Sequence, residues 1–278
     1  MQKNIFEDHQ EQKLRKYFSE CKINFSEPLE YPPVAISMGS TIERSRNGNT
    51  VYPIPIGTYG NFSMITAPPK TKKTYFVSLL VSTYISGKNN FSGNIRGHRD
   101  NKSILHFDTE QGHWHCQRVF KRTNDMANIG DCEKYYTFGL RTITQKDKLS
   151  FIEYTLKKYQ NVGLVVIDGI ADLISDPNDY EQSNMAADKL LIWSAKYNCH
   201  IITVIHSTYG TTKAKGHLGS LLGQRTETEI NLEANTVNKQ WVTVKCQKSR
   251  GFPFETFSFY INDYGYPEVV GDLYDPLL

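Results

Sequence analysis

The sequence has little of what marks secreted or membrane proteins. Its five cysteines are scattered and form no Cys-x-x-Cys pair, which argues against a disulfide framework. No stretch approaches the roughly 20 apolar residues that a membrane-spanning helix needs. Residues 1–18 are charged from the start and lack the apolar segment of a secretory signal. We therefore expect a soluble protein of the reducing cytoplasm, with no membrane as a partner.

A concentrated excess of charge is also missing. The 278 residues include 32 Lys and Arg against 29 Asp and Glu, which gives a net charge of +3. This balance neither indicates nor excludes nucleic-acid binding, because a ring around DNA needs positive charge only on its inner loops. The length fits one sizeable α/β domain, or one such domain with a small appendage. We place the boundary at a proline-containing linker, with an N-terminal helix and linker in 1–33 and the main domain in 34–278.

From residue 61 onward, apolar strands alternate with helices. The strands are expected at 61–66, 103–108, 136–141, 163–168 and 200–206. The helices are expected at 73–86, 111–123, 146–160 and 184–197. This alternation predicts a parallel sheet with right-handed crossovers. Segments 228–234, 240–248 and 256–262 instead alternate apolar and polar residues, as antiparallel strands do. The predicted fold class is therefore α/β, a mainly parallel twisted sheet flanked by helices, with antiparallel strands at the C-terminal end.

The loop after the first buried strand has the position of a phosphate-binding loop. Residues 67–74 read APPKTKKT and lie between an expected strand and an expected helix. In such loops a lysine reaches the β- and γ-phosphates and the next hydroxyl binds Mg²⁺, the roles of Lys73 and Thr74 here. We expect the whole loop to bind nucleotide: Ala67, Pro68, Pro69, Lys70, Thr71, Lys72, Lys73 and Thr74.

The loop departs from the usual motif in its glycines. Ala67 and Lys72 stand at the two glycine positions, and the prolines at 68 and 69 remove two N–H donors. Lys70 and Lys72 add positive charge that can compensate. An ordinary basic loop between a strand and a helix would show the same residues. The loop therefore indicates nucleotide binding only together with partner motifs.

Three side chains at the ends of neighbouring strands supply those partners. Glu110 follows the strand at 103–108, where a base is needed to orient and deprotonate water. Asp168 ends an apolar strand, the arrangement that holds Mg²⁺. His206 ends the strand at 200–206 and is a candidate sensor of the γ-phosphate. Asp108 fits better as a cap of the turn. The alternatives are a helix-capping Asp168 and a structural His206.

These residues resemble a known family. Segments 107–111 (FDTEQ), 165–174 (VVIDGIADLI) and 249–263 (SRGFPFETFSFYIND) are similar to RecA-like AAA ATPases of Bacteroidetes mobile genetic elements. That family is related to the hexameric RepA and DnaB helicases, and the resemblance covers about residues 50–265. It implies a RecA-like ATPase domain that uses ATP and Mg²⁺, forms a homo-oligomer, expected to be a hexameric ring, and acts on single-stranded DNA.

The resemblance also implies two sets of cations outside the loop. Lys248 and Arg250 match the pair that a neighbouring subunit inserts in DnaB-like rings, although two cations on one strand face are often only solvated surface. Lys213 and Lys215 lie in a segment expected to face DNA, with Gly216 and Gly219 as its flexible ends. A mobile surface loop is the alternative for that segment.

The sequence leaves several functions open. The leading hypothesis is an ATP-dependent DNA motor or helicase that serves replication or mobilisation of a mobile element. A nucleotide-dependent assembly or regulatory ATPase without unwinding activity is the first alternative, and a weak nucleotide-binding scaffold is the second. A zinc site at His113, His115 and Cys116 is not expected, because these residues share one predicted helix without a second pair of ligands.

Overall fold

A mostly parallel sheet forms the centre of the larger of two compact units, Met1–Tyr31 and Pro32–Leu278. The computed structural model describes residues 2–28, 30–45, 48–208 and 214–271. The parallel part of the sheet consists of β3 (Phe62–Ala67), β5 (Ser103–Asp108), β6 (Tyr135–Gly139), β7 (Val162–Asp168), β8 (His200–His206) and β9 (Thr228–Ala234). The antiparallel part consists of β10 (Val242–Ser249), β11 (Phe257–Ile261) and β12 (Pro267–Val269).

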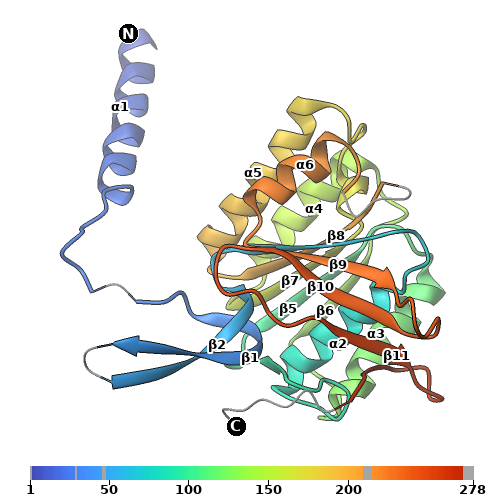
Figure 1. Cartoon of the computed structure of the whole chain (residues 1–278). Coiled ribbons are helices and arrows are strands. Elements are labelled where there is room, and N and C mark those ends of the chain that lie inside the picture. The colour runs from blue at the N-terminus through green and yellow to red at the C-terminus, as the bar shows by residue number, and fades with distance from the viewer. Residues whose placement is uncertain (1, 29, 46–47, 209–213, 272–278) are drawn as a thin grey trace. The chain divides into compact units, whose positions relative to one another are not determined.

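In the described residues these nine strands lie in the order β12-β11-β10-β9-β3-β8-β7-β5-β6 (Figure 1). The layout confirms the predicted α/β fold with a mainly parallel sheet and antiparallel C-terminal strands. One detail of the prediction is wrong, because β9 runs parallel to β3 and only its other edge pairs antiparallel, with β10. The alternation of apolar and polar residues in β9 therefore did not predict that β9 runs parallel to one of its two neighbours, β3.

Helices cover both faces of the sheet (Figure 1). One face carries α2 (Lys73–Ser86) and α3 (His113–Ala127). The other carries α4 (Gln145–Lys158), α5 (Tyr180–Tyr197) and α6 (Gly216–Arg225). A short 3₁₀ helix, η1 (Ile170–Leu173), follows β7.

Strand β7 shows how the two cores form. It is buried along its whole length, and successive side chains point to opposite faces of the sheet. Leu164 and Val166 pack in the core that α2 and α3 cover, whereas Val165 and Ile167 pack in the core under α4, α5 and α6. A strand with both faces buried must be almost wholly apolar, and this is the pattern that the sequence has there.

The helices on the second face begin at side-chain caps. The side chain of Thr144 accepts a hydrogen bond from the backbone N–H of Asp147 and starts α4. The side chain of Asp179 accepts one from Gln182 and starts α5, four residues earlier than the apolar spacing predicted. Caps therefore explain where these two helices begin.

A smaller sheet is built by β1 (Val34–Ser45), β2 (Gly48–Thr58) and β4 (Ile95–Gly97), in the order β2-β1-β4. It packs residues such as Ile36 of β1 into the same core as α2.

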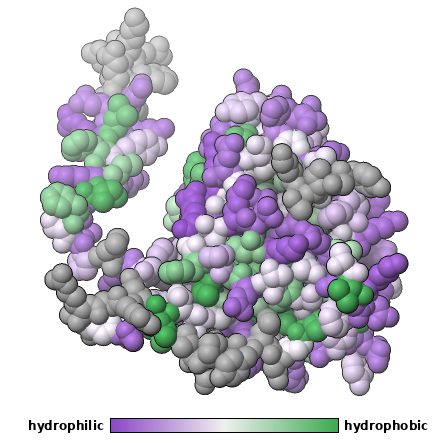
Figure 2. Space-filling model, in the orientation of Figure 1, coloured by the Kyte–Doolittle hydropathy of each residue, from purple (hydrophilic) through white to green (hydrophobic). Residues whose placement is uncertain are grey.

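The smaller unit contains α1 (Gln2–Glu20). Exposed apolar side chains in this unit include Leu14, Phe18, Ile23 and Phe25. Figure 2 shows hydrophobic patches on α1 and a mostly hydrophilic surface on the larger unit, in the face turned to the viewer. None of the helices in the described ranges has the length and apolar character to span a membrane.

Candidate nucleotide-binding site

The candidate site lies where the carboxyl ends of four parallel strands meet. The register places Ala67 of β3 beside His206 of β8, and Asp108 of β5 beside Asp168 of β7. A cleft of about 400 Å³ opens at these strand ends. Its lining comes from the loop before α2, from the strand ends and from α3: Lys70, Thr71, Lys72, Lys73, Thr74, Tyr75, Asp108, Glu110, Gln111, His115, Arg118, Val119, Arg122, Asp168 and His206.

The loop between β3 and α2 takes its shape without glycine. Lys70 and Lys72 have φ angles of 65° and 58°, in the left-handed region where glycine is usual. The Thr71 hydroxyl donates to the carbonyl oxygen of Pro68 at 2.9 Å and braces the turn. Lys72 therefore adopts the conformation of the motif glycine that it replaces, at a cost in backbone strain.

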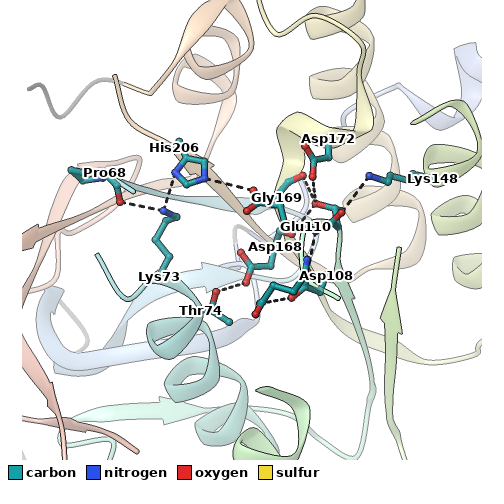
Figure 3. Close-up of polar contacts among 12 residues, drawn as sticks. Pro68, Lys73, Thr74, Asp108, Glu110, Lys148, Asp168, Gly169, Asp172 and His206 are labelled. Atoms are coloured by element: carbon teal, nitrogen blue, oxygen red, sulfur yellow. Dashed lines mark hydrogen bonds and ion pairs between the residues drawn. The ribbon is translucent and has the colours of Figure 1, made fainter. Parts of the chain in front are cut away.

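The Lys73 ammonium points into the cleft, at the start of α2 (Figure 3). Its Nζ lies 3.0 Å from Nδ1 of His206 and donates to the carbonyl oxygen of Pro68 at 3.2 Å. Burial lowers the pKa of Lys73, while the charges of Asp168 and Glu110 act in the opposite direction. A bound anion at this position would favour the charged form of the amine.

Thr74 and Asp168 join the start of α2 to the end of β7. The Thr74 hydroxyl donates to Oδ2 of Asp168 at 2.9 Å. Burial, followed by the neighbouring Asp108, raises the pKa of Asp168 to about 7. A positive charge next to Asp168 would reverse this effect, because the ionised carboxylate would then have a partner.

This donor set fits Mg²⁺ together with a nucleotide. In the described residues, His, Cys, Asp and Glu side chains form no group of three that could hold a metal ion by themselves. Mg²⁺ is usually bound by only one or two protein oxygens, with phosphate oxygens and water completing its shell. The Thr74 hydroxyl and the Asp168 carboxylate are the residues that would hold it.

Glu110 reaches the same cleft from the end of β5, and half of its side chain is exposed. Its Oε1 lies 3.6 Å from Nε2 of His206. The polar contact with His206 lowers the pKa of Glu110 more than any other effect, and the charges of Lys73 and Lys148 lower it further. Glu110 is therefore ionised near neutral pH and faces the open part of the cleft.

Asp108 lines the cleft and also organises the loop after β5. Its Oδ1 accepts the backbone N–H groups of Glu110 and Gln111, and its Oδ2 accepts the side-chain amide of Gln111 at 2.6 Å. The cap of the turn that the sequence predicted for Asp108 is thus what the structure shows.

Residues around Thr109 support the site and escaped the sequence analysis (Figure 3). The Thr109 hydroxyl contacts the carbonyl oxygen of Gly169 at 2.9 Å and Oδ2 of Asp172 at 3.0 Å. Lys148, which is 6% exposed, donates to the carbonyl oxygen of Thr109 at 3.4 Å. The glycine directly after Asp168 was the only sequence signal, since glycine often marks a close backbone approach.

Lys248 and Arg250 lie outside the cleft. The ammonium of Lys248 pairs with Oε2 of Glu229 at 3.0 Å, and Arg250 donates to the carbonyl oxygen of Arg225 at 2.9 Å. The expectation that both lie on one strand is wrong, because β10 has a register shift between Cys246 and Lys248 and ends before Arg250.

The segment expected to face DNA is only partly described. Lys213 lies outside the described residues. Lys215 is exposed and its backbone N–H donates to the carbonyl oxygen of His206 at 3.0 Å. The expectation of flexible glycines is wrong, because Gly216 begins α6 and Gly219 lies buried within it, where a Cβ would come within 2.5 Å of Ala214.

A comparison with protein-family models agrees with this geometry. A model described as an AAA domain matches residues 35–211, which is more than half of the chain. The matched range contains the loop at 67–74 together with Glu110, Asp168 and His206. No curated protein matches the chain. The chain therefore belongs to the AAA domain family of nucleotide-hydrolysing P-loop ATPases.

Proposed function

We propose that the protein is an ATP-driven DNA motor of the RepA and DnaB type, which serves replication or mobilisation of a mobile element. The observation that carries the proposal is the convergence of Lys73, Glu110, Asp168 and His206 on one cleft. RecA-like motors need a phosphate-binding amine, a metal-binding acid and a base at neighbouring strand ends.

The residues divide the chemistry between them. Bound ATP with Mg²⁺ supplies the phosphoanhydride bond and a cation that stabilises charge on the phosphates. Lys73 binds and orients phosphate oxygens, and Thr74 and Asp168 supply metal-binding oxygens. The Glu110 carboxylate orients a water molecule and accepts its proton as the water attacks the γ-phosphorus atom, while the bond from that atom to the β,γ-bridging oxygen breaks and ADP leaves. His206 contacts both the Lys73 ammonium and the Glu110 carboxylate, so it can transmit a change at the phosphates to β8.

His206 links the site to the segment proposed to bind DNA. Its carbonyl oxygen accepts the N–H of Lys215, so the turn before α6 is attached to the strand end that senses the phosphates. Lys215 and Lys213 are the proposed DNA contacts, through salt-sensitive attraction to the phosphate backbone. A shift of His206 would move this turn directly.

A ring of subunits would complete the site with cations from a neighbour. Lys248 and Arg250 are the proposed pair, in a homo-oligomer that we expect to be a hexamer. The Lys248 side chain is 63% exposed, so phosphate can reach its ammonium, whereas its partner Glu229 is only 6% exposed and would lose its cation in such an exchange.

The test is ATP turnover with and without single-stranded DNA, in wild type, Glu110→Gln and the control Glu255→Gln. Glu255 is exposed and lies outside the cleft. We expect turnover that DNA stimulates, a loss of at least about 100-fold in Glu110→Gln, and no change in Glu255→Gln. ATP turnover that single-stranded DNA does not change would favour the regulatory ATPase. Absence of turnover in wild type would favour the scaffold.

A further inference from the structure

Arg122 is a buried cation beside the candidate site. Its side chain is 9% exposed and lines the cleft from the third turn of α3. Its Nε and Nη2 donate to the Ser78 hydroxyl at 3.2 Å and 3.0 Å, and Nη2 also reaches the carbonyl oxygen of Thr74 at 3.4 Å. The guanidinium carbon lies 4.0 Å from the centre of the Tyr75 ring. Arg122 thus contacts the first two turns of α2, at Thr74, Tyr75 and Ser78.

No carboxylate in the described part of the chain forms an ion pair with Arg122. Its hydrogen-bond partners are a hydroxyl and a carbonyl, which are neutral. A charge removed from water is unfavourable unless an opposite charge compensates it. Burial accordingly lowers the pKa of Arg122; the neighbouring Tyr75 acts in the opposite direction, and the like charge of Arg118 lowers the pKa again. The charge of Arg122 therefore has no described counterpart in the protein.

The position of Arg122 indicates where its counter-charge comes from. The residue lines the same cleft as Lys73 and Thr74, which is the proposed place of the phosphates. Coulomb attraction is stronger in such a partly buried site than in bulk water. Arg122 also touches Thr74 itself, whose hydroxyl is the proposed metal ligand.

We propose that Arg122 is a positioning residue of the nucleotide site, which fixes the first turn of α2 and carries a charge that bound triphosphate balances. This inference rests on the proposed nucleotide binding. Through Arg122, helix α3, which follows Glu110, is attached to the phosphate-binding turn. The charge of Arg122 also explains how a loop with two prolines and no glycine gains anion affinity from outside the loop.

The proposal predicts opposite effects on the free and the bound protein. In Arg122→Met, a side chain of similar length removes an uncompensated buried charge, and the Ser78 hydroxyl keeps its own bond to the Thr74 carbonyl oxygen at 3.0 Å. The thermal midpoint of the free protein should therefore stay equal or rise. The dissociation constants of Mg-ATP and of Mg-tripolyphosphate should rise by about tenfold or more.

The experiment measures thermal midpoints and the two dissociation constants in wild type, Arg122→Met, Arg122→Lys and Lys121→Met. Lys121 is the matched control, since it is exposed on the same helix and does not line this cleft. We expect Lys121→Met to behave as wild type. Arg122→Lys keeps the charge without the planar fork, so it should recover part of the affinity.

The following outcomes would overturn the proposal. Unchanged affinity in a folded Arg122→Met, whatever its midpoint, would show that the guanidinium only packs against α2. If Arg122→Met does not fold, an Arg122→Lys that binds both ligands as wild type does would decide against the role of the guanidinium. Wild type that binds neither Mg-ATP nor Mg-tripolyphosphate would instead overturn the proposed function, together with the inference that rests on it.

Discussion

The hydroxyl of Thr74 donates to Oδ2 of Asp168 across 2.9 Å and thereby connects the first turn of α2 with the end of β7. Without a metal ion this hydrogen bond is the only one that the structure gives to the Asp168 carboxylate among the described residues. It does not offset burial, so the pKa of Asp168 is raised to about 7. The two residues lie where the proposed Mg²⁺ would bind.

That relationship predicts a pH-dependent effect of Asp168→Asn in the metal-free protein. An unfolded aspartate titrates near about 3.9, so the folded protein binds a proton more readily than the unfolded chain between that value and about 7. Stability is then lost as pH rises through this window. Asp168→Asn should be more stable than wild type at pH 8, on the order of 2 kcal/mol, and the difference should vanish near pH 4.

Urea unfolding in EDTA across this pH range measures the effect. Asp263→Asn is the matched control, because Asp263 is exposed in a turn and does not line the cleft. With Mg-ATP the order should reverse, since the amide cannot replace the carboxylate toward a cation. Equal stability of Asp168→Asn and wild type at pH 8 would contradict the raised pKa.

A second prediction concerns Lys72, which stands at a glycine position of the phosphate-binding loop. Its φ of 58° is unfavourable for a residue with a Cβ by about 1 kcal/mol. Lys72→Gly should therefore raise the free energy of unfolding by up to about 1 kcal/mol, less a small loss from the exposed bond of Lys72 Nζ to the Gln240 carbonyl oxygen. Nucleotide affinity should fall modestly, because the loop keeps its shape but loses one of the cations that line the cleft.

Lys121→Gly is the control, and its expected effect on the free energy of unfolding has the opposite sign. Lys121 lies within α3, where glycine should lower the free energy of unfolding by about 1 kcal/mol. Denaturant unfolding of both variants gives the comparison. If Lys72→Gly lost as much stability as Lys121→Gly, the left-handed conformation of the loop would be wrong.

Strand ends were predictable because the local pattern and the tertiary environment agree there. Helix α2 begins at Lys73 and ends at Ser86 as predicted, since a loop motif precedes it and Gly87 follows it. Strand β5 spans Ser103–Asp108 as predicted. Because carboxyl ends of parallel strands share one edge of the sheet, the order of the motifs also predicted which side chains meet.

Helix α6 was missed because its sequence contains Gly216, Gly219 and Gly223, which lower helix propensity. Packing overrides that preference, since Leu218 and Leu222 are fully buried against the core under α5. Glycine is also required for space, as a Cβ at position 219 would collide with Ala214. Helix propensity alone cannot predict such a tertiary contact.

Lys148 and Arg122 were missed for a different reason. Lysine and arginine are usually exposed, so a sequence pattern assigns them to the solvent face of a helix. Both are buried beside the site, and their partners are backbone or hydroxyl oxygens from distant segments, such as Thr109 and Ser78. Only the folded structure brings these partners together.

A third prediction concerns Gly169, which lets the ends of β5 and β7 lie in contact. Its φ is +105°, and a Cβ there would lie 2.2 Å from the Thr109 hydroxyl oxygen and 3.2 Å from atoms of the Glu110 side chain. Gly169→Ala must therefore both strain the backbone and push the loop of Glu110 away from the cleft. We expect a loss of stability on the order of 3 kcal/mol, together with a loss of ATP turnover in the fraction that stays folded.

Gly130→Ala separates the two causes. Gly130 also has a positive φ, of +75°, but no atom lies within 4 Å of the Cβ that alanine would add. This variant should lose only about 1 kcal/mol from backbone strain and keep full turnover. Denaturant unfolding and turnover per folded molecule distinguish them. Turnover of Gly169→Ala at the level of Gly130→Ala would show that the contact of Gly169 with Thr109 does not position Glu110.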